Sequence, residues 1–195
     1  MKIKKTLSFV ALTLFFLILF CYGFCYGDNN TKTIPSLFPN LTFNNSLSTE
    51  ERVYLGIQKK STFSLNDITS PFILVDMTNT YCVSCKKNIK IFNEVYKKTL
   101  KDKNLKEKIK VIGIAIGNNK TEVDYFRNEH RILYPIIIDP EFTVHKALGE
   151  PRVPYTMFIR RDTKKKEIIF KVHKGVFESA DKLVDELKLI CSENF

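Results

Sequence analysis

The sequence FILVDMTNTYCVSC, residues 72–85, decides the fold of this chain. Its first six residues are apolar except for Asp76, which predicts a buried strand. After the second cysteine, apolar residues recur at helical spacing between Lys86 and Lys103, so a helix is expected there. Cys82 and Cys85 therefore lie between a strand and a helix, about one helical turn apart and close enough for a disulfide.

The start of a helix favours the ionised form of a cysteine. The first N–H groups of a helix have no partner within it, and the helix dipole places a partial positive charge at the same end. Both effects stabilise a thiolate relative to a thiol. The order strand, CxxC, helix thus predicts a redox-active cysteine pair.

Length and composition fit one globular domain with a leader. The chain has 195 residues, of which 44% are hydrophobic, and it contains 16 phenylalanines. This is enough apolar material to bury a core, and it differs from the composition of a disordered chain.

Residues 1–27 have the pattern of an export segment. Three lysines near the start precede the apolar run Leu7–Phe20, and the next charge is Asp28. This pattern predicts a signal peptide whose basic end stays in the cytoplasm. The uncharged stretch Thr6–Gly27 is also long enough to span a bilayer, so a retained membrane anchor stays open. Both alternatives place the remaining chain outside the cytoplasm, in the periplasm or on the outer face of the cytoplasmic membrane.

The three other cysteines carry no predicted redox role. Cys21 and Cys25 lie in the leader, each after a phenylalanine where a lipoprotein leader would have small residues. Cys191, near the end of the last predicted helix, is expected to be a small buried apolar residue. The pair Cys82–Cys85 closes too small a loop to stabilise the fold much, which favours a chemical role for it.

The charge of the chain is basic. Without the three lysines of the leader, the formal net charge falls from +10 to +7. Much of the excess lies in Lys97–Lys110, which is expected to form a solvated face. Nucleic acid binding is not expected, because the chain is predicted to be exported and does not interleave basic with aromatic residues.

The chain after the leader divides into a linker and a domain. Residues 28–47 are polar and contain two prolines, which predicts a linker, and residues 48–195 form the domain. An N-terminal extension is expected to hold short strands near Leu41–Phe43 and Thr62–Leu65 and a helix capped by Ser48 or Thr49. Further elements are predicted after residue 86: strands at 110–116, 134–138, 155–159 and 168–172, and helices from Thr121 to 131, at 142–148 and at 179–191. The order β-α-β-α-β-α-β-β-α predicts an α/β fold with a mixed central sheet and helices on both faces.

This arrangement resembles the thioredoxin fold, and within it the exported TlpA-like thiol-disulfide oxidoreductases, over roughly residues 36–191. The residues that carry the resemblance are Cys82-Val83-Ser84-Cys85 after a strand and Arg152-Val153-Pro154-Tyr155-Thr156 before a later strand. The strand and helix of Val111–Arg131 match the central insertion that separates TlpA-like proteins from plain thioredoxin. The resemblance implies a protein without cofactor or metal that exchanges disulfides with client proteins.

Within this family resemblance, Cys82 is the expected attacking thiolate and Cys85 the resolving thiol, and the oxidised state joins them as a disulfide. Asp76 stands six residues before Cys82, where thioredoxins place a buried acid. Burial would raise its pKa and allow it to accept the proton of Cys85, although a role in hydrogen bonding to local backbone stays open.

The resemblance also implies a substrate-binding surface. The Val153–Pro154 bond is expected to be cis and to lie against the disulfide, with Pro154 exposing the backbone of Val153 to an incoming partner. Tyr81 and Val153 are expected to contact the substrate. Tyr81 replaces the tryptophan that often precedes the first cysteine, and Val-Ser replaces a dipeptide that usually contains proline or glycine. The redox potential therefore does not follow from the resemblance. We expect a monomer that reduces client disulfides with electrons from a membrane-bound donor.

Two other functions remain open at this point. A peroxiredoxin-like peroxidase is disfavoured by Val75 and Asn79, which stand where that family has proline and threonine. A metallochaperone or cytochrome assembly factor would hold copper with the two cysteines and a histidine such as His173, although related copper proteins space their cysteines by three. The histidines His130, His145 and His173 are expected at the surface or at strand edges.

Overall fold

The structure is a computed structural model that describes residues 35–57 and 60–192. The predicted leader, residues 1–27, lies outside the described residues, as does the first part of the predicted linker. Within the two described ranges, no helix has the length and apolar character needed to cross a bilayer.

A six-stranded mixed sheet forms the centre of the domain, with strand order β1-β8-β7-β4-β5-β6. β4, β5 and β6 are parallel, whereas β7, β8 and β1 each run antiparallel to their neighbours. The strands are β1 Ser36–Leu37, β4 Phe72–Thr78, β5 Ile109–Ile116, β6 Ile136–Asp139, β7 Tyr155–Arg161 and β8 Glu167–Lys174. Cys82 and Cys85 follow the C-terminal end of the central strand β4, at the edge where open α/β sheets form their ligand sites.

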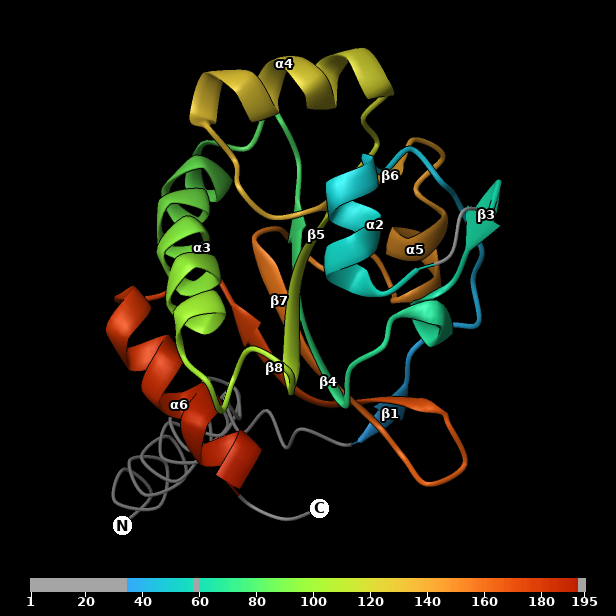
Figure 1. The fold of residues 1–195 in the computed structure, drawn as a ribbon. Coiled ribbons are helices and arrows are strands. Elements are labelled where there is room, and N and C mark those ends of the chain that lie inside the picture. Colours follow the sequence, from blue (N-terminus) through green and yellow to red (C-terminus); the bar gives the residue numbers. More distant parts are fainter. Residues whose placement is uncertain (1–34, 58–59, 193–195) are drawn as a thin grey trace, which may run out of the picture. The chain divides into compact units, whose positions relative to one another are not determined.

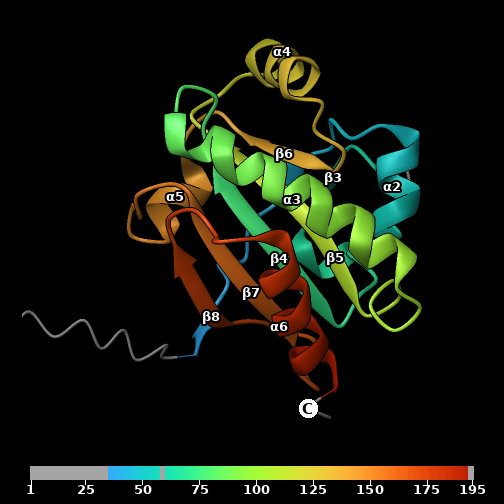
Figure 2. The same cartoon turned by 90° about the vertical axis from the view of Figure 1, so that its left-hand side faces the viewer.

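Helices cover both faces of this sheet (Figure 1). One face carries α3 (Val83–Lys101), α4 (Lys120–His130) and α6 (Ala180–Ser192), and Figure 2 shows α3 and α6 in front of the strands. The other face carries α2 (Thr49–Leu55) and α5 (Thr143–Ala147), together with the hairpin β2 Phe43–Asn44 and β3 Thr62–Phe63 and the 3-10 helix Leu65–Asp67.

The central strands are buried on both faces, and successive side chains of β4 point to opposite sides. Ile73, Val75 and Met77 pack in the core under α2 and α5, while Leu74 packs in the core under α3. Asp76 alternates with Leu74 and thus lies on the α3 side. The sequence of β4 therefore places one buried acid beneath the helix that carries the cysteines.

The predicted order of elements is confirmed, and the thioredoxin-like α/β class with it. Two details differ. The cap of α4 is Asn119 rather than Thr121, because Asn119 and Glu122 form a reciprocal capping box. Residues 36–47, predicted to be linker, contribute β1 at the sheet edge and bury Phe38, Phe43 and Leu47 in the core. Apolar residues spaced among polar ones in an irregular segment give no period from which such packing could be predicted.

Candidate functional site

Cys82 is the N-cap residue of α3, and its position fixes the sulfur at the helix start. A disulfide joins it to Cys85, with the two Cα atoms 5.3 Å apart. Cys85 is completely buried, whereas Cys82 is partly exposed. The Cys85 backbone N–H points at Cys82 Sγ over 3.1 Å, and Ser84 Oγ lies 3.3 Å from the same sulfur. Once the disulfide is reduced, these groups and the helix dipole stabilise a thiolate on Cys82.

The loop before β7 also contacts the sulfur of Cys82. The Val153–Pro154 peptide bond is cis, as the resemblance implied, and the carbonyl oxygen of Val153 lies 3.8 Å from Cys82 Sγ. A groove of about 380 Å³ opens here, and its lining includes Cys82, Tyr81, Val153, His145 and Arg152. The structure therefore brings together five residues predicted from the sequence: both cysteines, Tyr81, Val153 and Pro154.

Asp76 lies in a buried polar network with Asn88 of α3 and Tyr134. Its carboxylate accepts a hydrogen bond from the Asn88 side-chain amide at 2.9 Å and one from the Tyr134 hydroxyl at 3.3 Å. Asn88 also accepts the Phe177 backbone N–H at 3.2 Å, which fixes the orientation of its amide group toward Asp76. Since Asn88 follows Cys85 by three residues on the buried face of α3, the network connects the acid to the helical turn next to the inner sulfur.

The environment of this acid changes its protonation. Desolvation by burial raises the pKa of Asp76 to about 7, and the two hydrogen bonds oppose that shift only in part. Burial also holds the pKa of Tyr134 well above its usual range, so its hydroxyl stays protonated and remains a donor. A carboxyl group with a pKa near 7 can accept or release a proton under physiological conditions.

The loop that leads into Cys82 is fastened to the turn between β5 and α4. The Asn79 amide donates to the carbonyl of Ile116 at 2.8 Å. Asn118, completely buried, accepts the Thr80 backbone N–H at 3.0 Å and donates to the Thr80 hydroxyl at 2.8 Å. Next to them, the Tyr81 hydroxyl donates to a Glu122 carboxylate oxygen at 2.5 Å. The predicted insertion thus holds the redox loop through four side-chain hydrogen bonds, which we call the loop clamp.

Sequence reasoning missed four polar residues of this site: Asn88, Tyr134, Asn118 and Glu122. Asn88 does carry a signal, because it is a polar residue on the apolar face of a predicted amphipathic helix. Tyr134 and Asn118 lie 58 and 38 residues from their partners Asp76 and Thr80, and the local pattern around them gives no sign of those contacts.

Among the other residues singled out from the sequence, His145 lines the groove that contains Cys82, whereas Cys191 and His173 do not. Cys191 is a free, buried cysteine whose pKa is raised mainly by burial, in keeping with its predicted role as a small apolar residue. His173 stacks on Phe177, with ring centroids 3.9 Å apart, and His145 Nε2 lies 3.0 Å from the Pro151 carbonyl. Over residues 35–57 and 60–192, no three histidine, cysteine or acidic side chains gather in a way that could hold a metal ion.

Comparison with known proteins gives a family match and several likenesses. Residues 47–167, more than half of the chain, match the model of the AhpC/TSA family. The thiol-disulfide oxidoreductase ResA of Geobacillus thermodenitrificans is 26% identical over 105 residues, which make up 54% of this chain and 58% of that protein. The chain therefore spans less than two thirds of the length of this curated relative.

Two solved structures share the fold. A thiol:disulfide interchange protein from Bacteroides sp. has a TM-score of 0.56 at 17% identity, with 80% of this chain and 89% of that chain covered. A thioredoxin-related protein from Neisseria meningitidis serogroup B has a TM-score of 0.51 at 20% identity, with 70% and 96% covered. At these identities the likeness shows the thioredoxin-like fold alone.

Proposed function

The chain belongs to the AhpC/TSA family, and we propose that it is a thiol-disulfide oxidoreductase that reduces disulfides of client proteins outside the cytoplasm. The observation that carries the proposal is the cysteine pair itself. Cys82 is partly exposed at the N-cap of α3 and bonded to the completely buried Cys85. The exposed sulfur can react with a partner disulfide, and the buried sulfur can then attack the mixed disulfide that forms. Dithiol exchange needs this arrangement. The predicted leader supports the extracytoplasmic location.

The reaction begins with the reduced pair. The Cys82 thiolate attacks one sulfur of a client disulfide, and a Cys82–client disulfide forms while the client disulfide breaks. The second client sulfur leaves as a thiolate and takes a proton from water. The groove beside Val153 offers the client backbone a place to lie next to the reacting sulfur.

The second exchange releases the client. The Cys85 thiol gives its proton to the Asp76 carboxylate and attacks Cys82 Sγ, so that the Cys82–Cys85 disulfide forms and the bond to the client breaks. The client cysteine leaves as a thiolate. The client has gained two electrons and the pair has lost two, and a membrane-bound donor restores the dithiol before the next cycle.

The test is catalysis by the full chain with dithiothreitol as the electron source. We expect it to accelerate reduction of a model protein disulfide such as insulin well above the rate with dithiothreitol alone. Equilibration with glutathione then gives the potential of the pair: about −200 mV or lower fits a reductant, whereas about −120 mV would mark an oxidant. A rate equal to that of dithiothreitol alone would refute the proposal. Consumption of peroxide at catalytic rates would favour the peroxidase instead.

A further inference from the structure

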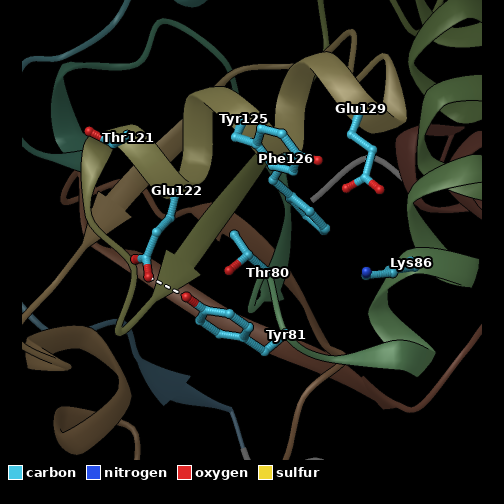
Figure 3. A pocket seen from close by; sticks show the side chains of 8 residues that line it. All are labelled: Thr80, Tyr81, Lys86, Thr121, Glu122, Tyr125, Phe126 and Glu129. Carbon is cyan, nitrogen blue, oxygen red and sulfur yellow. Dashed lines mark hydrogen bonds between the residues drawn. The ribbon is translucent and has the colours of Figure 1, made fainter.

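A second cavity adjoins the redox loop on the side of α4 (Figure 3). It has a volume of about 500 Å³, within the range of ligand pockets, and we call it the α4 pocket. Three aromatic side chains face it: Tyr81 from the loop, and Tyr125 and Phe126 from α4. Tyr81 is 73% exposed and Tyr125 70% exposed. Because two large aromatic rings are exposed at the same cavity, we infer that a partner covers this surface.

One wall of the α4 pocket, formed by Thr80, Tyr81 and Glu122, is held by hydrogen bonds within the protein. The loop clamp ties Thr80 to Asn118, and the Tyr81 hydroxyl is held by Glu122. Glu122 is itself held in place, because its second oxygen accepts the Asn119 backbone N–H at 2.8 Å in the capping box of α4. A preformed aromatic wall loses little conformational entropy when a ligand binds.

The charges around the α4 pocket favour a neutral or basic polypeptide. Lys86 from α3 and Glu129 from α4 line the end of the pocket that lies next to α3 (Figure 3). One ammonium donor and one carboxylate acceptor match the C=O and N–H groups of a peptide backbone. With Glu122, the lining carries two carboxylates and one ammonium, which disfavours an acidic segment.

The α4 pocket and the groove that contains Cys82 share one lining residue, Tyr81. Tyr81 directly precedes Cys82 in the chain. A client segment bonded to Cys82 therefore passes the Tyr81 ring. Each residue of an extended segment advances it by about 3.3 Å, so only side chains within a few residues of the client cysteine can reach the pocket.

We propose that the α4 pocket receives an aromatic side chain of the client, from a neutral or basic segment that flanks the client's reactive cysteine. The inference rests on the proposed function and names the class of substrate that the site selects. Stacking against the exposed rings of Tyr81 and Tyr125 supplies the binding energy. The distance along the client chain between its aromatic residue and its cysteine decides which segments fit.

A peptide series with the full chain tests this inference. Each substrate is a neutral, disulfide-linked peptide, with one phenylalanine placed two to five residues from the cysteine on either side, or alanine throughout. We expect wild type to reduce at least one phenylalanine peptide about tenfold faster, in kcat/KM, than the alanine peptide. Tyr125→Ala should abolish this preference and Tyr125→Phe should keep it. The exposed residue Val53 on α2 gives the control Val53→Ala, which should behave as wild type.

A substrate too small to reach the α4 pocket distinguishes an error in the pocket proposal from an error in the proposed function. Bis(2-hydroxyethyl) disulfide should be reduced equally by wild type and Tyr125→Ala. If it is reduced but no phenylalanine preference exists, or if the preference survives Tyr125→Ala, the α4 pocket proposal is wrong and the proposed function stands. If the only effect of Tyr125→Ala is to dissociate a dimer, the pocket binds a second copy of the chain. If its only effect is to release the chain from phosphatidylglycerol vesicles, the pocket binds a lipid. The proposal is wrong in both cases. If wild type reduces no substrate, the proposed function itself fails.

Discussion

Replacing Cys82 with serine is expected to lower the rate of client disulfide reduction by at least about a thousandfold, to the rate of the chemical reductant alone. A serine hydroxyl is not ionised near neutral pH and cannot form the mixed disulfide. Removal of a nucleophile leaves no other group that can replace it, because Cys85 is completely buried and cannot reach a client. The measurement is insulin reduction by wild type and variant under identical reductant.

Replacing Cys85 has a different expected result. Cys85→Ser retains the attacking sulfur but has no group to resolve the mixed disulfide, so clients should remain covalently bound to Cys82. Captured proteins are isolated from the native compartment on nonreducing gels and identified by mass spectrometry. The double variant Cys82→Ser with Cys85→Ser should capture nothing, and Cys191→Ser should keep wild-type turnover because this cysteine is free and buried elsewhere. A Cys82→Ser protein with the parental rate would contradict the assignment of the nucleophile.

Asp76→Asn is expected to stabilise the protein above neutral pH and to remove a pH dependence of its stability. In the folded chain burial raises the pKa of Asp76 to about 7, whereas the unfolded value is 3.8. Between these values the folded state holds a proton that the unfolded state has released, so the free energy of unfolding falls as pH rises. From pH 5 to pH 8 wild type should lose about 3 kcal/mol through this group.

The neutral asparagine cannot ionise, and its amide can still accept from Asn88 and donate to the oxygen of Tyr134. Urea denaturation at pH 5 and pH 8 measures the effect, and subtracting the variant from wild type cancels every other titrating group. An identical pH dependence in the two proteins would show that Asp76 does not titrate in this range.

The same substitution tests the proton transfer. Release of a mixed disulfide by Cys85 should accelerate as pH rises through about 7 in wild type, because the Asp76 carboxylate becomes available as the base. In Asp76→Asn this acceleration should disappear, while the first attack by Cys82 should keep its own pH profile. Rapid-quench trapping of the intermediate separates the two steps. Loss of both profiles together would point to a structural role for the acid.

The sequence predicts the redox residues of this site better than the distant residues that hydrogen-bond to them. CxxC follows an apolar strand and precedes apolar residues at helical spacing, so the local sequence alone predicts a helix that begins near Cys82. Asp76 follows from the alternation of β4, which must direct it to one face of the sheet. The Val-Pro pair before β7 could be assigned only by resemblance, because nothing local requires a cis bond or proximity to sulfur.

The remaining parts depend on contacts between distant segments. Tyr134 reaches Asp76 because β6 lies beside β5, and no periodic pattern encodes which residue enters that space. The short strand β1 follows from its pairing with β8, more than a hundred residues later, rather than from its own two residues. Short elements of this kind have too few residues for a period and are formed by tertiary packing.

The central claim is that the N-terminus of α3 keeps Cys82 ionised and reactive while Cys85 is buried behind it. Alkylation of the reduced full chain with iodoacetamide across a pH series, followed at the Cys82 peptide by mass spectrometry, measures this directly. The account predicts that Cys82 reacts with an apparent pKa within about 3.5 to 7.5, and that Cys85 reacts far more slowly. If Cys82 reacts only as pH rises through about 8.5, like an ordinary thiol, the account is contradicted.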